Sequence, residues 1–344
     1  MLHFSPYFKK EVIRLKKAIV VGATGGTGAA ITEELAKRGI PTILFGRSLQ
    51  KLEQLRIKIG KPEHVTIVTG DAFCQADIVK AAEDADVLFH CANVPYHEME
   101  NKLIPLGESV MGAANQLGVK VVVVDGIYPY GRRQSDRVAE DHPKQPHTRK
   151  GKTRLAFEQM LLEQRWGKVP VMIVRLPDYY GPTANEASYL GSTLQAIACG
   201  KIAFFIGNMH VPREFIYLPD AAFMITELAT RDTAYGRGEN WNLPGAGLIS
   251  GQEIVRIARE ASGYSKPVIP LGRMGLSLLG MFIPVMREIV EMLYLTKEPL
   301  TLSGDKYEKW IGPIRATSFQ QGIWHTIHDL QRKNVLSHTT VENQ

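Results

Sequence analysis

The sequence predicts an α/β fold, with a doubly wound parallel sheet in the first half of the chain and a smaller lobe in the second. Three observations predict it. Apolar, β-branched runs alternate with helical patterns from residue 17 onward, and short connections join them. The run Lys120–Val124 is almost pure valine, which is typical of a strand buried on both faces of a parallel sheet. The composition, 44% hydrophobic and 22% charged over 344 residues, is that of a folded globular protein.

The elements of the first half follow from local patterns. Runs of apolar and β-branched residues predict strands at Lys17–Val21, Pro41–Phe45, His64–Thr69, Ala85–Cys91, Lys120–Val124 and Val169–Arg175. Apolar residues at helical spacing predict helices at Ala29–Arg38, Leu49–Ile59, Gln75–Ala82, Ile104–Leu117 and Lys152–Gln164. This strand–helix alternation implies right-handed crossovers between parallel strands.

After about Tyr180 the pattern changes, because glycine and proline become common and the strands become isolated. We expect strands at Ala203–Ile206 and Glu214–Tyr217, and helices at Ala221–Thr230, Gly251–Ala261 and Arg287–Leu295. The predicted division is an N-terminal extension at 1–16, a sheet domain at 17–182 and a lobe at 183–344, from which some segments return to the sheet. The apolar stretch Met274–Met286 is too short for a membrane span of ~20 residues. We expect a buried helix there, with an interfacial helix as the alternative.

Charge and cysteine content exclude several classes of protein. The net charge of +6 is spread along the chain without a basic stripe or zinc-finger spacing, so we expect no nucleic-acid partner. The three cysteines form no C-x-x-C motif, so we expect neither a disulfide framework nor a metal site, and a cytoplasmic location is favoured. The first apolar run ends at Gly22, so we expect no signal peptide and no stable membrane insertion.

A glycine-rich loop joins the first predicted strand to the first predicted helix. Its spacing is G-x-x-G-x-x-G, over Gly22, Gly25 and Gly28. In this position glycines allow a tight turn, close approach of a pyrophosphate and close helix–sheet packing, while the helix N-terminus offers free N–H groups. We therefore interpret residues 17–182 as an NAD(P)-binding domain of Rossmann type. The predicted loop contacts are Gly22, Thr24, Gly25, Gly26, Thr27 and Gly28.

The following strand ends indicate which dinucleotide is bound. Arg47 follows the second strand, and no acidic residue lies between Ile40 and Ser48, which favours NADP over NAD. Asp71 follows the third strand and can accept from an adenine amino group, or it can cap the next helix. Small residues follow the fourth strand. The predicted contacts at these ends are Arg47, Ser48, Asp71, Ala72, Cys91, Ala92 and Asn93.

From Lys17 to Asp329 the motifs together resemble the short-chain dehydrogenase/reductase superfamily, in its extended branch, the NAD-dependent epimerase/dehydratase family. Beyond the loop, the resemblance rests on the segments Tyr128–Gly131, Arg175–Pro182, Arg213–Asp220 and Trp241–Leu243. It implies an oxidoreductase or epimerase-like enzyme that acts on a carbonyl or carbinol carbon of a small molecule such as a nucleotide sugar. Relatives often dimerise, so a homodimer is an expectation as well.

The resemblance leaves the catalytic triad of the family incomplete. The family carries Ser or Thr, then Tyr, then Lys four residues after the Tyr, and counting from Tyr130-Gly131 places these on Gly126, Thr148 and Lys152. Only Lys152 remains, and we expect it to hold the cofactor ribose. A threonine hydroxyl is a far weaker acid than a phenol, so Thr148 is a poor substitute for the tyrosine.

Other residues are therefore candidates for the proton transfer. Tyr128 is expected to face the cleft and is the first candidate, with Tyr180 second, and His147 and Asn93 weaker. Each tyrosine can instead be a core residue with a satisfied hydroxyl. Arg213 matches the arginine that contacts a substrate diphosphate in sugar-nucleotide epimerases, and the alternative is an ion pair with Glu214 or Asp220. The remaining alternatives for the whole chain are a non-catalytic NADP redox sensor and a scaffold protein that keeps the cofactor for stability.

Overall fold

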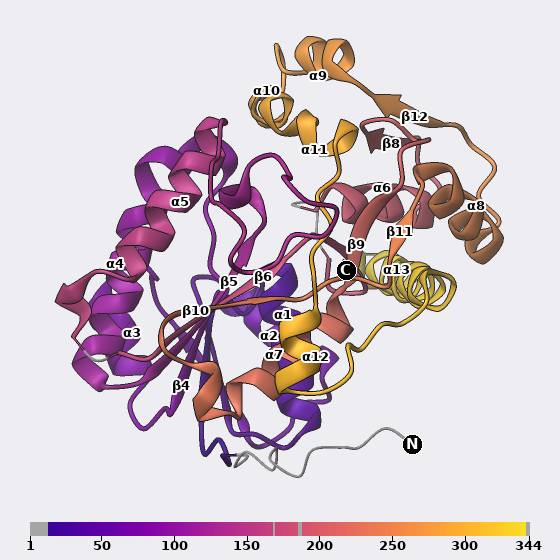
Figure 1. Cartoon of the computed structure of the whole chain (residues 1–344). Coiled ribbons are helices and arrows are strands. Elements are labelled where there is room, and N and C mark those ends of the chain that lie inside the picture. Colours follow the sequence, from indigo (N-terminus) through magenta and orange to yellow (C-terminus); the bar gives the residue numbers. More distant parts are fainter. Residues whose placement is uncertain (1–12, 168, 185–187, 342–344) are drawn as a thin grey trace, which may run out of the picture.

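The structure is a computed structural model that describes residues 13–167, 169–184 and 188–341 (Figure 1). Residues 1–12, most of the predicted N-terminal extension, lie outside the described residues. Within the described ranges a large sheet with helices on both faces is joined to a second lobe (Figure 1). No helix in those ranges is long and apolar enough to cross a bilayer.

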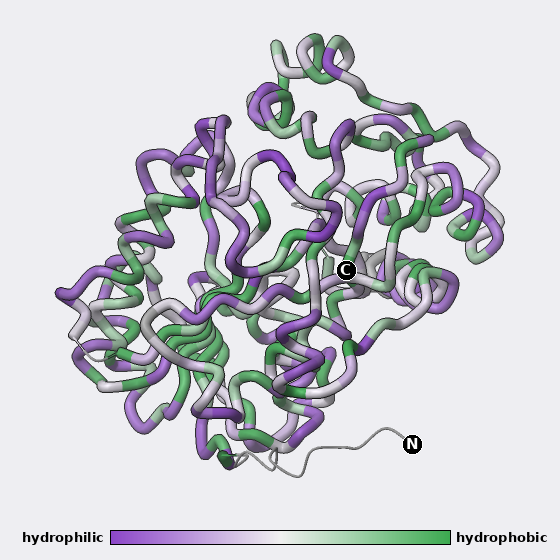
Figure 2. The backbone as a smooth tube through the Cα atoms, in the orientation of Figure 1, coloured by the Kyte–Doolittle hydropathy of each residue, from purple (hydrophilic) through white to green (hydrophobic). Residues whose placement is uncertain are grey.

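The large sheet confirms the predicted fold class. Its strand order is β10-β6-β5-β4-β1-β2-β3, and each neighbouring pair runs parallel. The strands are β1 (Ala18–Val21), β2 (Thr42–Gly46), β3 (Val65–Thr69), β4 (Val87–His90), β5 (Lys120–Gly126), β6 (Val171–Leu176) and β10 (Arg237–Asn242). Most of these strands are hydrophobic along their length (Figure 2), as expected for strands covered on both faces.

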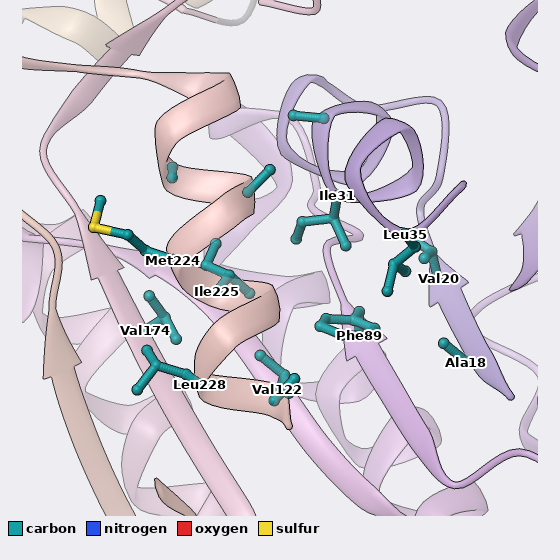
Figure 3. Packing of buried hydrophobic residues seen from close by; sticks show 14 of the residues in the cluster. Ala18, Val20, Ile31, Leu35, Phe89, Val122, Val174, Met224, Ile225 and Leu228 are labelled. Atoms are coloured by element: carbon teal, nitrogen blue, oxygen red, sulfur yellow. The ribbon is translucent and has the colours of Figure 1, made fainter. Parts of the chain in front are cut away.

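Helices cover both faces of this sheet. One face carries α1 (Gly26–Lys37), α2 (Leu49–Lys58) and α7 (Leu218–Ala229), and the other carries α3 (Gln75–Ala81), α4 (Met99–Leu117) and α5 (Arg149–Leu161). Figure 3 shows the first interface, where apolar side chains of α1 and α7 meet those of the strands. Its labelled members include Ile31, Leu35, Met224, Ile225, Leu228, Val20, Phe89, Val122 and Val174. Both α7 and β10 come from the chain after residue 183.

The second lobe has its own core. A three-stranded sheet of order β11-β9-β7 combines β7 (Asp178–Tyr180), β9 (Arg213–Tyr217) and β11 (Leu248–Ile249), and β8 (Ala203–Ile206) pairs with β12 (Val268–Leu271). Three helices pack around this core: α6 (Tyr189–Ala198), α8 (Gly251–Ser262) and α13 (Phe319–Val341). The helix α12 (Asp305–Trp310) contacts β10. Short 3-10 turns connect elements at η1 (Tyr96–Glu98), η2 (Tyr128–Tyr130), η3 (Gln164–Trp166) and η4 (Asp232–Ala234).

The apolar stretch Met274–Met286 is where the sequence prediction is wrong. Instead of one buried helix it forms α9 (Arg273–Leu279) and the start of α10 (Pro284–Ile289), which continues through η5 (Val290–Leu293) into α11 (Tyr294–Lys297). A proline at the first position of α10 is compatible with a new helix but not with the continuation of the old one. Two short helices cannot bury all their sides, and Phe282 is 83% exposed.

Candidate functional site

The sheet has its switch point between β1 and β4, because the chain leaves these neighbouring strands toward helices on opposite faces. In such sheets ligands bind in the crevice outside the carboxyl ends of the strands at that point. A cavity of about 870 Å³ lies there. It runs from the glycine loop after β1, past the ends of β2 to β6, to the second lobe.

The glycine loop fits a phosphate cradle. Gly22 has a φ of +84°, and a Cβ on it would lie 2.6 Å from the Ala92 backbone. A Cβ on Gly28 would lie 2.3 Å from the Gly22 carbonyl oxygen, so this residue serves helix packing and does not line the cavity. A Cβ on Gly25 would come no closer than 3.4 Å to any heavy atom, and this residue lines the cavity. Thr24, Gly26 and Thr27 line it as well.

The first turn of α1 supports the same reading of the loop. It carries no acidic side chain, and Gly25 at the N-cap provides no side-chain hydrogen bond. The first N–H groups of a helix have no partner within the helix, and their dipole favours an anion. The loop can therefore bind a phosphate group without competition from a carboxylate of this turn.

The cavity also reaches the ends of β2 and β3. Arg47 lines it, and Lys51 of α2 adds a second cation that the sequence analysis missed. Ser48 does not line it, because its hydroxyl caps α2 by accepting the Lys51 N–H at 3.4 Å. Asp71 lines the cavity while its carboxylate accepts the Phe73 N–H at 3.1 Å, so it also stabilises the turn before α3.

The end of β4 contributes small residues to the cavity wall. Ala72 after β3 lines it, and so do Cys91, Ala92 and Asn93 after β4. Burial raises the pKa of the Cys91 thiol to about 12, so the thiol stays protonated and is a poor nucleophile. His90 next to it packs edge-on against Phe157, on the other face of the sheet.

The structure does not bring Lys152 or Thr148 to the cavity. Lys152 is exposed and does not line it. Thr148 is the N-cap of α5, and its hydroxyl accepts the Gly151 N–H at 3.1 Å. The roles that the sequence analysis gave to these two residues therefore do not fit their positions. For Lys152 the reason is helix phase, since residue 152 lies on the exposed side of α5 while residues 150 and 154 lie on its buried side.

Arg154 is the cation of α5 that reaches the cavity. Its Nη1 donates to the Asp125 carboxylate at 2.8 Å, and its Nη2 donates to the Asn93 side-chain oxygen at 2.9 Å. Asp125 also accepts from Arg175, which is fully buried and is bound by Glu158 at 2.6 Å. This network balances the buried charges and fixes the position of the Arg154 guanidinium at the cavity wall.

Lys150, one turn before Arg154, is also buried, but it faces the second lobe. Its Nζ donates to the carboxylates of Glu288 at 2.5 Å and Glu291 at 2.6 Å. Lys150 and Arg154 are four residues apart, which is the spacing of the family's Tyr and Lys. That spacing on the buried side of a helix is the sequence signal that could have located both residues.

Tyr128 lies at the cavity wall, where it was expected. Its hydroxyl is 2.6 Å from that of Tyr96, and the Tyr189 hydroxyl donates to Tyr96 at 3.4 Å. Burial raises the pKa of Tyr128 well above its ordinary value, and the neighbouring Tyr96 raises it further. The described residues place no hydrogen-bonding cation on this hydroxyl. The phenol therefore keeps its proton at neutral pH.

Tyr180 does not reach the cavity. It is 1% exposed and packs against Tyr217 and Phe319 in the core of the second lobe. The two preceding residues of β7, Asp178 and Tyr179, line the cavity instead. His147 packs against Tyr294 and does not line the cavity either.

Arg213 lies at the second-lobe end of the cavity. Its Nη2 donates to the Ile206 carbonyl oxygen at 3.0 Å, and its buried Nε has no hydrogen-bond partner among the described residues. The expected alternative, an ion pair with Glu214 or Asp220, is not formed. Glu214 accepts backbone N–H groups, and Asp220 binds Thr317 and Arg315. Arg213 thus keeps donor capacity at a cavity wall, which suits an anionic ligand.

Asp178 is an ionisable group near Arg213 that the sequence analysis missed. It lines the cavity, and one of its carboxylate oxygens is buried without a partner among the described residues. Burial raises the pKa of Asp178 to about 6, and the positive charge of Arg213 opposes that rise. Asp178 therefore changes its charge close to neutral pH.

Comparisons with known proteins agree with this fold. A family model described as the NAD dependent epimerase/dehydratase family matches residues 18–243. A structure of UDP-glucuronic acid 4-epimerase from Bacillus cereus, in complex with UDP-glucuronic acid and NAD, is 18% identical with a TM-score of 0.74, over 92% of this chain and 99% of that chain. A dTDP-glucose 4,6-dehydratase from Bacillus anthracis in complex with NAD is 14% identical, also with a TM-score of 0.74, over 92% and 97%.

Curated relatives match shorter segments. Hydroxysteroid dehydrogenase-like protein 1 of Gallus gallus is 38% identical over 86 residues, which are 24% of this chain and 25% of the relative. The human mitochondrial dehydrogenase/reductase SDR family member 2 is 28% identical over 125 residues, 34% of this chain and 41% of the relative. The chain thus matches less than half the length of either relative. The family model, in contrast, covers well over half of this chain. The chain therefore belongs to the NAD-dependent epimerase/dehydratase family.

Proposed function

We propose that the chain is an NADP(H)-dependent oxidoreductase that reduces the carbonyl carbon of an anionic small molecule. The observation that carries the proposal is that the glycine loop, Tyr128 and Arg213 all line one continuous cavity. A nicotinamide dinucleotide, when bound, supplies or accepts a hydride, and the chain holds the reactants and moves the proton.

The residues of the cavity fit a dinucleotide. Gly25 leaves room for a pyrophosphate beside the free N–H groups of α1. Arg47 and Lys51 at the end of β2 support the 2′-phosphate of NADP, because an arginine fork binds phosphate well. The solved structures named above contain NAD. The preference for NADP therefore rests on these two cations alone.

We assign to Arg154 the ribose contact that the family's lysine makes, because Arg154 lines the cavity and Lys152 does not. A guanidinium has five N–H donors, and Asp125 and Asn93 engage two of its nitrogens. The remaining donors are available to ribose hydroxyls at the cavity wall.

Tyr128 is the proposed proton donor. A phenol that burial keeps protonated can donate to an alkoxide oxygen as it forms during carbonyl reduction. In the oxidative direction the same phenol must first lose its proton, and no described cation stabilises the phenolate. The protonated phenol is the form of Tyr128 that carbonyl reduction requires. Tyr96 and Tyr189 extend its hydroxyl into a chain along which the proton can be replaced.

A second function, redox sensing without turnover, is supported by one observation. A lysine stands at the helical position of the family's catalytic tyrosine, and two glutamates of the second lobe hold it. A protein with this arrangement can distinguish NADP from NADPH by the closure of that lobe, with no chemical step.

The test measures binding and turnover with one preparation. NADP, NADPH, NAD and NADH are titrated by calorimetry, and NADPH oxidation is then followed with a panel of carbonyl compounds that includes nucleotide sugars. We expect tighter binding of NADP(H) than of NAD(H), and turnover that Tyr128→Phe reduces and the core variant Tyr180→Phe does not. Unequal affinity for NADP and NADPH without turnover would favour the sensor. Equal affinities for all four, with no turnover, would contradict both functions.

A further inference from the structure

The outer end of the second lobe carries a cluster of exposed apolar side chains. We call residues 273–287 the apolar tip; they include α9, the turn after it and the start of α10, and lie far from the sheet (Figure 1). Met274, Met281 and Phe282 are 80%, 69% and 83% exposed. Leu278, Ile283 and Val285 are exposed as well. An exposed apolar cluster of this size on one short segment marks an interaction surface.

The charged residues within the apolar tip and just before it in the sequence all have one sign. Between Ala261 and Arg287 the sequence contains Lys266, Arg273 and Arg287 but no acidic residue. Glu288, the next residue along the chain, is 19% exposed at its side chain and binds Lys150 through its carboxylate. The apolar tip is therefore an apolar surface with a cationic border, in a chain whose net charge is +6.

This charge pattern decides between the possible occupants. In a symmetric dimer through the apolar tip, Arg273 and Arg287 of two copies would approach each other with no acidic residue of the tip to separate them. An anionic bilayer surface provides the opposite charge and accepts apolar side chains below its headgroups. No described helix can span a bilayer, so the contact would be peripheral.

We propose that the apolar tip docks the protein on the surface of an anionic lipid bilayer. Met281 and Phe282 enter the headgroup region, and Arg273 and Arg287 lie against the anionic headgroups. Two residues of the apolar tip, Val285 and Met286, also line the cavity. Docking therefore brings the cavity wall next to the bilayer, and it does not depend on the proposed reduction.

The experiment uses the full chain and flotation with vesicles. One set contains phosphatidylcholine with phosphatidylglycerol at a ratio of 7:3, and the other contains phosphatidylcholine alone. The tip variant combines Met281→Ser with Phe282→Ser. The matched control combines Ile57→Ser with Ile202→Ser, which are 55% and 54% exposed and lie elsewhere on the molecule. We expect the wild type and the control to bind the anionic vesicles, and the tip variant to bind at least tenfold more weakly.

Two further measurements separate the outcomes. Replacing both Arg273 and Arg287 by Gln should weaken binding about fivefold for each charge removed, because each contributes about that factor at an anionic surface. Sedimentation velocity of the wild type and the tip variant tests self-association. Equal binding of the tip variant and the control would overturn the proposal, as would a wild-type dimer that the tip substitutions dissociate. NADPH affinity without vesicles should be the same in the tip variant and the wild type, which keeps this test separate from that of the proposed function.

Discussion

Replacing Gly25 by valine tests the phosphate cradle directly. Gly25 has extended backbone angles, φ −74° and ψ 163°, which any residue adopts. A Cβ there meets the Gly22 carbonyl oxygen at 3.4 Å and the Cys91 carbonyl oxygen at 4.0 Å, which are ordinary contacts. The folded chain without ligand should therefore accept the valine with a change of less than about 1 kcal/mol in the free energy of unfolding.

The same side chain fills the part of the cavity that a pyrophosphate would occupy. Loss of two charge-assisted hydrogen bonds, each worth roughly 1.5–3 kcal/mol, corresponds to about 3 kcal/mol or more. We therefore expect the Kd for NADPH to rise at least about 100-fold. Gly28→Val should behave in the opposite way, because its Cβ would lie 2.3 Å from a backbone oxygen and must disturb the fold.

The assay is calorimetric titration of NADPH together with thermal unfolding without ligand. Gly272→Val is the matched control, since a Cβ there meets no atom within 4 Å and its φ is −87°. We expect the control to keep both wild-type affinity and wild-type Tm. Unchanged NADPH affinity in Gly25→Val would refute the assignment of this loop as the phosphate cradle.

Four further predictions follow from the site. Arg47→Ala should remove most of the preference for NADP over NAD, about tenfold or more, as measured by the ratio of the two Kd values. Tyr128→Phe should lower NADPH turnover by about 10²–10⁴ while leaving NADPH affinity nearly intact, and an equal loss in both would contradict its role as proton donor. Arg154→Lys should weaken NADPH binding, whereas Lys152→Ala, at an exposed residue, should not. If only Lys152→Ala weakened binding, Lys152 and not Arg154 would hold the cofactor ribose. The pKa of Asp178 in the folded chain is about 6, above its ordinary value. The stability that this group contributes is fully present below about pH 4 and is lost as the pH rises through 6. The free energy of unfolding, measured by denaturation at a series of pH values, should therefore decline less between pH 4 and pH 6 in Asp178→Asn than in the wild type.

The sequence predicts the parts of the fold that depend on local pattern. The buried valines of β5 and the glycine loop after β1 are signals of this kind, and each is found in place. Local pattern did not predict the strand β10, because its sequence Arg237–Asn242 is polar. Only the family resemblance of the segment Trp241–Leu243 pointed to a strand there. Its pairing with β6 is decided by the rest of the fold.

In the site, too, the residues that could be predicted are those that depend on local sequence pattern. Cavity residues that follow β1 to β4 come directly after recognisable strands, so their positions could be counted from strand ends. Arg154 was missed, because a long connection separates β5 from α5 and the residue count across it does not fix the helix phase. Only its four-residue spacing from Lys150 pointed to it. The tertiary contacts of Arg154 with Asp125 and Asn93 fix that phase.

The contact of Lys150 with Glu288 and Glu291 has a consequence for the rates of ligand exchange. These ion pairs connect α5 to the segment formed by α10 and η5, and other residues of that segment line the cavity. Because residues of that segment line the cavity, we expect a bound ligand of dinucleotide size to leave faster when the two glutamates release the lysine. Because the glutamates are partly exposed, salt weakens these ion pairs. Higher ionic strength should therefore shorten the time that a ligand stays bound, apart from any effect on how fast it arrives.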